Sequence, residues 1–205
     1  AGDKQLGFAE LIEAAYRGRI SLSTTAFYRT PDIHFNKETG KGHPFYYFAN
    51  GAAACEVEID TTTGENRVLR ADLLQDVGNS LNPAIDLGQI EGAFIQGLGW
   101  LTTEELKWNA DGRLISDSPA TYKIPTAHDC PPVFNVAFYD APNREPTIHR
   151  SKAVGEPPLM LAVAAWCALR QAAAAAGKGL PYLAAPATPE AVLAAVQEAT
   201  RGASN

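Results

Sequence analysis

GAAACEVEIDTTTGENRVLRADLLQDV, residues 51–77, is the stretch that decides the fold class. It continues a β segment that we predict over 45–59, in which apolar and acidic residues alternate from Cys55 onward. A period of two is typical of a strand with one buried face. The polar turn 61–66 then leads into a second β-type run over 67–77. The sequence therefore predicts a β-hairpin at the centre of the chain.

Helical patterns flank this hairpin on both sides. Residues 8–19 place apolar side chains at helical spacing, which predicts an amphipathic helix. After the hairpin, Asn82-Pro83 and Thr188-Pro189 each combine a capping residue with proline at the first helical position. The further expected elements are a turn-rich loop at 30–44, a helix over 82–98, a second hairpin over 104–116, a strand over 133–139 and an apolar core helix over 157–176.

This order of elements predicts an α+β, or mixed α/β, fold with helices packed on an antiparallel sheet built from hairpins. We expect one unit over residues 1–205, with flexible ends at 1–7 and 201–205. The chain opens with Ala1 rather than methionine, so we interpret it as a piece of a longer or processed protein.

Composition excludes several function classes. The 205 residues carry 17 basic and 23 acidic side chains, a net charge of −6, which argues against nucleic-acid binding. The longest apolar stretch, 159–169, is shorter than the roughly 20 residues of a membrane span, so no membrane partner is expected. The three cysteines are far apart, which argues against a disulfide framework, a zinc site or an iron–sulfur site on this chain. We expect a cytoplasmic location.

The segment GQIEGAFIQGLG, residues 88–99, could carry chemistry. Gly88 and Gly92 lie four residues apart on one helical face, which allows either tight helix packing or the close approach of a flat ligand. Gln89 and Gln96 share a face and could offer amides to a polar heterocycle. The segment is no dinucleotide fingerprint, because it follows a helix and its third glycine is missing.

The segment SKAVGEPP, residues 151–158, contains a second candidate. The proline after Glu156 predicts a stiff, extended backbone there and a helix that begins immediately afterwards. The helix dipole favours the ionised carboxylate, whereas burial under the apolar helix opposes it. Glu156 is therefore either a rigidly held general base or a helix-capping acid.

Other polar residues give weaker signals. Asp76, Asn79 and Asn82 lie in the turn between a strand and a helix, where they could cap the helix or line a ligand pocket. The histidines are scattered among loops and strands, and none has a spacing that predicts a catalytic pair; they are His34, His43, His128 and His149.

Three stretches carry a family resemblance: LNPAIDLGQIEGAFIQGLGWLTTEEL (81–106), TYKIPTAHD (121–129) and RSKAVGEPPLMLAVAAWCAL (150–169). In order and spacing they resemble the C-terminal portion of the molybdenum hydroxylases. Within that family they are most similar to the molybdopterin-binding subunit of bacterial xanthine dehydrogenases. The upstream stretch 37–78 fits the same branch.

The resemblance implies a fold that is part of the molybdenum hydroxylase cofactor-binding domain, and it implies roles for particular residues. Glu156 matches the glutamate that activates the molybdenum-bound hydroxide during hydroxylation of hypoxanthine or xanthine. Gln89 and Gly155 match positions beside the molybdenum–molybdopterin cofactor, and no residue of this chain is implied as a metal ligand. The alternatives are an aldehyde or other N-heterocycle oxidoreductase of the same family, or a non-catalytic assembly domain.

The resemblance also implies partners. Molybdenum-binding subunits of this family are several times longer than this chain, so the rest of that subunit is the first partner. Its electrons pass through 2Fe-2S clusters to FAD on other domains or subunits, and the enzyme is expected to be oligomeric. Most of the cofactor cradle lies outside this chain. We therefore expect the isolated chain to carry no cofactor and to be inactive.

Overall fold

The computed structural model describes residues 5–201. The chain divides into two compact units, residues 1–46 and 47–205. Of the ends predicted to be flexible, residues 1–4 and 202–205 lie outside the described residues.

The first unit contains α1 (Phe8–Arg17) and a two-stranded antiparallel sheet of β1 (His34–Asn36) and β2 (Lys41–His43). The amphipathic helix is confirmed, although none of its residues is buried. The short sheet lies in the stretch predicted as a loop. It forms because Gly40 adopts φ +64°, a left-handed conformation that closes a tight turn between the strands.

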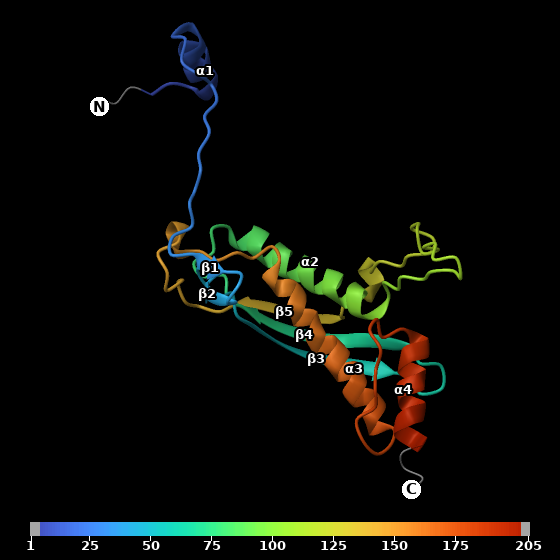
Figure 1. The fold of residues 1–205 in the computed structure, drawn as a ribbon. Helices are drawn as coiled ribbons and strands as arrows, with labels where there is room; N and C mark the ends of the chain where they lie inside the picture. Colours follow the sequence, from blue (N-terminus) through green and yellow to red (C-terminus); the bar gives the residue numbers. More distant parts are fainter. Residues whose placement is uncertain (1–4, 202–205) are drawn as a thin grey trace. The chain divides into compact units, whose positions relative to one another are not determined.

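The second unit combines a three-stranded sheet with helices (Figure 1). Both the mixed α/β class and the predicted helix starts after Asn82 and Thr188 are confirmed. Its elements are β3 (Gly51–Ile59), β4 (Asn66–Gln75), α2 (Pro83–Thr102), η1 (Ala127–Asp129), β5 (Val133–Phe138), η2 (Ile148–Arg150), η3 (Pro157–Ala162), α3 (Val163–Ala175) and α4 (Pro189–Arg201).

The sheet has the order β3-β4-β5. The predicted hairpin is confirmed, since β3 and β4 pair antiparallel from Gly51↔Gln75 to Ile59↔Asn66 with one bulge. In contrast, β5 pairs parallel to β4, so the sheet that the sequence predicted as antiparallel is mixed. The reason is the connection between them: α2 lies between β4 and β5, and such a helical crossover returns the chain in the same direction.

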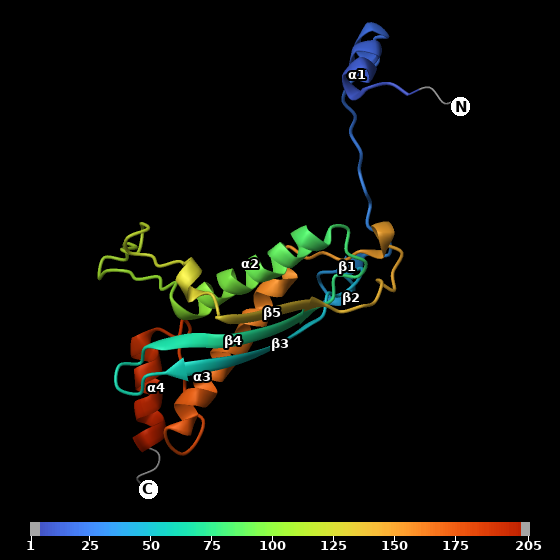
Figure 2. The ribbon, with the colours of Figure 1, turned by 180° about the vertical axis from the view of Figure 1, so that it is seen from behind.

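Helices α2 and α3 cover one face of the sheet, and the view from behind shows the strands in front of them (Figure 2). The aromatic rings of Phe94 on α2 and Phe134 on β5 lie 5.5 Å apart in the layer between helix and sheet. A second core joins α3 to α4. The first core consists of Ala71, Leu73, Val77, Ile90, Phe94, Leu101, Leu161 and Ala162, and the second of Leu169, Ala173, Leu183, Ala187, Val192, Ala195 and Val196.

The second predicted hairpin is only partly formed. Over 104–116 the backbone makes a single isolated bridge, Trp108↔Leu114, and the Asn109 side chain closes the turn by accepting from the Arg113 backbone N–H at 2.9 Å. A two-stranded ribbon without a third strand or a packed face is marginal in water, which explains why no regular strands form.

The predicted core helix begins as the 3₁₀ helix η3 and continues as α3. Together they form an apolar run, Pro157–Ala175, that is long enough to cross a membrane by length and composition alone. This run is longer than the apolar stretch read from the sequence. The core helix of a soluble protein passes the same test, and α3 packs against β3 and α4, although only 33% of the apolar window is buried.

Candidate functional site

Glu156 lies at the start of η3, directly before Pro157-Pro158. Its backbone has φ −101° and ψ −40°, so the predicted extended conformation is wrong. The Leu159 backbone N–H donates to the Glu156 carbonyl at 3.1 Å, and this first turn of η3 outweighs the steric bias of the following proline.

The Glu156 side chain is exposed, so the expected burial under the apolar helix is also wrong in this chain. Its carboxylate makes no capping hydrogen bond, which removes the interpretation as a helix-capping acid. Among the residues that the structure describes, no hydrogen bond or ion pair of this carboxylate is found. An unpaired carboxylate retains its full capacity to accept a proton from a ligand.

Gln89 and Gly155 come together from separate elements, α2 and the segment before η3. A Cβ built on Gly155 would lie 3.8 Å from Oε1 of Gln89. Both residues are exposed in this chain. The fold thus brings the Gln89 amide beside the backbone of Gly155, the residue that directly precedes Glu156 in the chain.

The two glycines of the first motif, Gly88 and Gly92, face open space. Apart from the neighbouring residues and the backbone of α2 itself, no described atom lies within 4 Å of a Cβ built on either of them, so tight packing against another element of this chain is excluded as their role. The close helix approach occurs instead at Gly97, where a Cβ would lie 2.5 Å from the Leu159 carbonyl oxygen. This leaves the face of α2 that holds Gly88 and Gly92 available to a group from outside the chain.

The polar residues of the turn before α2 have two different roles. Asn82 caps the helix, its Oδ1 accepting from the Ile85 backbone N–H at 3.3 Å. Asp76 and Asn79 bind the segment that leads to Glu156 instead: Asp76 pairs with Lys152, and the Asn79 side-chain amide donates to the His149 carbonyl at 3.0 Å. Sequence reasoning missed Lys152, because no sequence spacing signals an ion pair between residues so distant in the chain.

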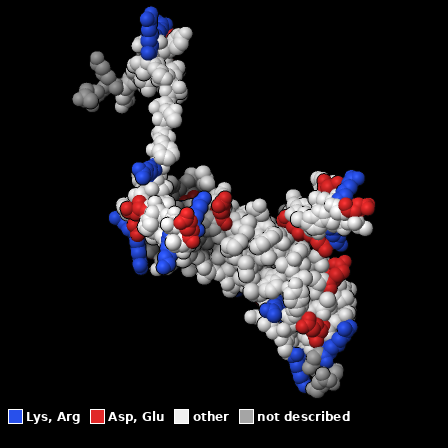
Figure 3. Space-filling model, in the orientation of Figure 1, with Lys and Arg blue, Asp and Glu red and all other residues white. Residues whose placement is uncertain are grey.

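The donor set suits an organic cofactor more than a directly held metal. No group of three or more histidine, cysteine, aspartate or glutamate side chains is close enough to hold a metal ion within residues 5–201. The Gln89 amide can both donate and accept hydrogen bonds, and the glycines leave room for a flat ring system. Few charged side chains lie over the middle of α2 and α3 in Figure 3. These residues fit one wall of a molybdopterin cradle.

The sequence profile of the molybdopterin cofactor-binding domain matches residues 1–131. The chain belongs to this family. The matched region contains Gln89, whereas Gly155 and Glu156 lie beyond it. The family-level resemblance to molybdenum hydroxylases is therefore confirmed.

Relatives in the molybdopterin cofactor-binding family include xanthine dehydrogenases. The chain is 48% identical to xanthine dehydrogenase/oxidase of Felis catus over 93% of its own length and 15% of the relative's. It is 50% identical to xanthine dehydrogenase/oxidase of Gallus gallus over 88% of this chain and 14% of the relative. It is 47% identical to xanthine dehydrogenase of Oryza sativa subsp. japonica over 95% of this chain and 15% of the relative. The chain thus spans about 15% of the length of these relatives.

Solved structures of the same class share the fold. Quinoline 2-oxidoreductase from Pseudomonas putida 86 superimposes with a TM-score of 0.67 at 30% identity, covering 74% of this chain and 19% of that one. Aldehyde oxidoreductase from Desulfovibrio gigas gives a TM-score of 0.67 at 27% identity, covering 80% and 17%. The similar proteins are oxidoreductases, and their greater length agrees with this chain being similar to one part of them.

Proposed function

We propose that this chain is the C-terminal part of the catalytic subunit of a xanthine dehydrogenase, in which Glu156 is the general base. The observation that carries the proposal is the meeting of Gln89 and Gly155 directly before Glu156, whose carboxylate makes no capping hydrogen bond. The identity of nearly half to the xanthine dehydrogenase relatives supports the class of enzyme. A bacterial type of subunit is supported by the resemblance of residues 37–78.

The molybdenum–molybdopterin group supplies, when bound, the two-electron oxidation and the oxygen that enters the substrate. The Gln89 amide would bind the polar edge of this group, and Gly155 would leave room for it at the backbone. A Glu156 carboxylate oxygen would accept the proton that is released as the electron-poor carbon of hypoxanthine or xanthine is hydroxylated. In the complete enzyme we expect surrounding protein to cover the exposed carboxylate.

The remaining parts of the proposal concern the rest of the enzyme. Electrons would leave through 2Fe-2S clusters to FAD on other domains or subunits, in an oligomer that completes the cofactor cradle. A cytoplasmic location is supported by the free state of the described cysteines, Cys55, Cys130 and Cys167. An aldehyde or N-heterocycle substrate is the second candidate, favoured by the structural similarity to quinoline and aldehyde oxidoreductases.

The test is Glu156→Gln in the complete enzyme, with Glu145→Gln as the control because Glu145 is also an exposed glutamate. The amide keeps the volume but cannot take the proton, so we expect turnover of xanthine to fall about 10²–10⁴-fold with normal molybdenum content. The control should keep full activity. Near-normal turnover by Glu156→Gln would contradict the role of Glu156 and favour a non-catalytic assembly domain.

A further inference from the structure

The segment that carries Glu156 is anchored to the turn between β4 and α2. The Lys152 backbone N–H donates to the Val77 carbonyl at 2.8 Å, and Gly78 and Ser151 form an antiparallel bridge. Asn79 makes two further hydrogen bonds: its backbone N–H donates to the Arg150 carbonyl at 3.0 Å, and its side-chain amide donates to the His149 carbonyl at 3.0 Å. We call residues 149–156 the glutamate strap.

The centre of this anchor is an ion pair that is nearly buried. Lys152 Nζ lies 2.5 Å from Asp76 Oδ2, and both side chains are only 11% exposed. Lys152 Nζ also donates to the Phe48 carbonyl at 2.8 Å, and the other oxygen of Asp76 accepts from the Gly78 backbone N–H at 3.0 Å. In every other ion pair of the described residues, both side chains are at least 32% exposed.

The ion pair fixes the strap on one side of Glu156, and η3 fixes it on the other. Downstream, Pro158 is buried and η3 packs closely on α2 at Gly97. Between the anchors lies the short linker Ala153–Gly155, in which the Ala153 backbone N–H donates to the Tyr47 hydroxyl at 2.9 Å. The Glu156 carboxylate has no bond of its own, so its place depends on the backbone alone.

We propose that the Asp76–Lys152 ion pair is a positioning device that holds the glutamate strap, and with it Glu156, at the working distance from the substrate. This inference rests on the proposed function of Glu156. A charged pair suits this task because removal of one partner leaves the other charge buried, which penalises any other arrangement of the strap. Positioning matters because a misplacement of about 1 Å can lower a rate about 10²-fold.

The first test needs no cofactor and uses the 205-residue chain. Lys152→Met removes the charge and keeps an unbranched side chain, so we expect the backbone amides of Lys152 and Asn79 to exchange hydrogen about 10-fold faster or more. The matched control is Lys107→Met, which breaks the exposed pair of Lys107 with Glu105 and should leave these amides unchanged.

Two outcomes of the exchange experiment overturn the proposal. One is unchanged protection of the strap in Lys152→Met. If Lys152→Met does not fold, the double variant Asp76→Asn/Lys152→Met takes its place, because it leaves no unpaired charge. The second contradicting outcome is that the strap in this double variant is as protected as in the unmodified chain. Faster exchange in either variant, together with recovery in Lys152→Arg, supports it.

The second test measures turnover in the complete enzyme. Lys152→Met should lower kcat about 10–100-fold with KM within about 2-fold, because the base is displaced and the substrate site is not. In a Glu156→Gln background the same substitution should cause no further loss, since a positioning residue acts only through the group that it positions. An additional loss of the same size in that background would mean general damage and overturn the proposal.

These arms separate the two ideas. If Glu156→Gln alone keeps its activity, the proposed base is wrong, whatever the exchange experiment shows. If Glu156→Gln is inactive but Lys152→Met is fully active, the base is supported and the positioning device is refuted.

Discussion

Gly97 is a position where one added methyl group should disturb the contact between α2 and η3. A Cβ there would lie 2.5 Å from the Leu159 carbonyl oxygen and 2.8 Å from Cβ of Ala162. Carbon–oxygen contacts in proteins usually lie at about 3.3–3.6 Å, so η3 would have to move about 0.8 Å away from α2. Neither contact atom can rotate away, since one belongs to the backbone and the other to alanine.

The expected loss of stability follows from two opposing effects. Overpacking a tight interface typically destabilises by about 1–3 kcal/mol, and the rigid neighbours place Gly97→Ala near the upper end. Replacing a helical glycine by alanine stabilises by about 1 kcal/mol. The net loss is about 2 kcal/mol, which corresponds to a fall in Tm of about 4–8 °C for a chain of this size.

The matched control lies on the same helix. At Gly92 no described atom outside the neighbouring residues and the α2 backbone lies within 4 Å of the built Cβ, so Gly92→Ala should show only the helix-propensity gain. We expect its Tm to rise by about 2–4 °C. Thermal unfolding of both variants, followed by circular dichroism, measures the difference. Equal shifts of the same sign would refute the close approach of α2 and η3 at Gly97.

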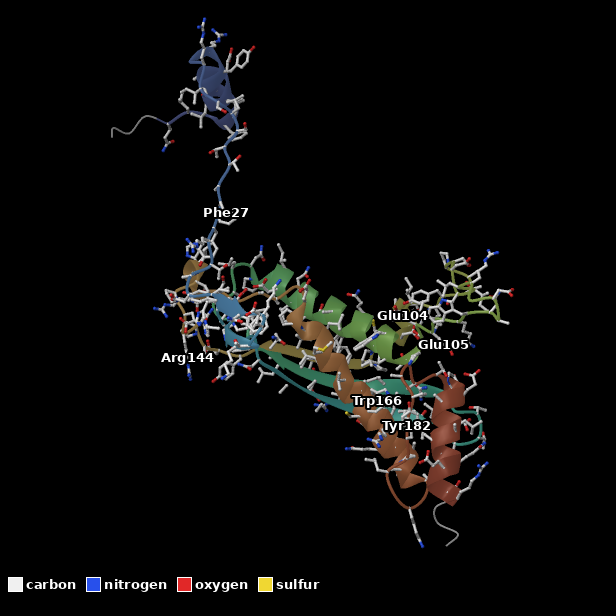
Figure 4. All side chains as sticks on the ribbon, viewed as in Figure 1. Phe27, Glu104, Glu105, Arg144, Trp166 and Tyr182 are labelled. Atoms are coloured by element: carbon white, nitrogen blue, oxygen red, sulfur yellow. The ribbon has the colours of Figure 1, made fainter. Side chains whose placement is uncertain are left out.

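Three further outcomes are expected. Burial raises the pKa of the Cys55 thiol to about 11, so alkylation at pH 8 should label Cys130 and Cys167 first. Between about pH 9 and 11 the thiol ionises in the unfolded chain but stays neutral in the folded chain, so the free energy of unfolding should fall over this range. Tm measured against pH should show this fall in the unmodified chain and not in Cys55→Ala. The Tyr122 hydroxyl donates a hydrogen bond to Glu104, a residue labelled in Figure 4, and this bond raises the pKa of Tyr122. An ultraviolet titration should therefore show a late-ionising tyrosine that is absent in Tyr122→Phe. An unchanged titration curve in that variant would contradict this bond. The isolated chain should bind no molybdenum cofactor and oxidise no purine, because contacts from other segments are missing; near-stoichiometric molybdenum by elemental analysis would contradict the view of an incomplete cradle.

The sequence indicated the individual residues of the candidate site but not how they lie relative to one another. Glu156, Gln89 and Gly155 stand in short motifs whose order and spacing resemble the molybdenum hydroxylases, and local rules place helix starts beside them. It did not predict that Gln89 and Gly155 meet, nor that Lys152 pairs with Asp76. Such contacts depend on how distant segments pack, and local propensity holds no information on them.

The sequence by itself determined the central hairpin and the starts of α2 and α4. Strand periodicity and capping residues such as Asn82 act over a few neighbouring residues, so the β3–β4 hairpin and the start of α2 could be predicted from the chain alone. Only the tertiary structure decided the parallel pairing of β5, the helical backbone of Glu156 and the open face at Gly88 and Gly92. Each of these depends on the packing of α2, η3 and the sheet against one another, where the burial of apolar surface outweighs the local preferences that a sequence displays.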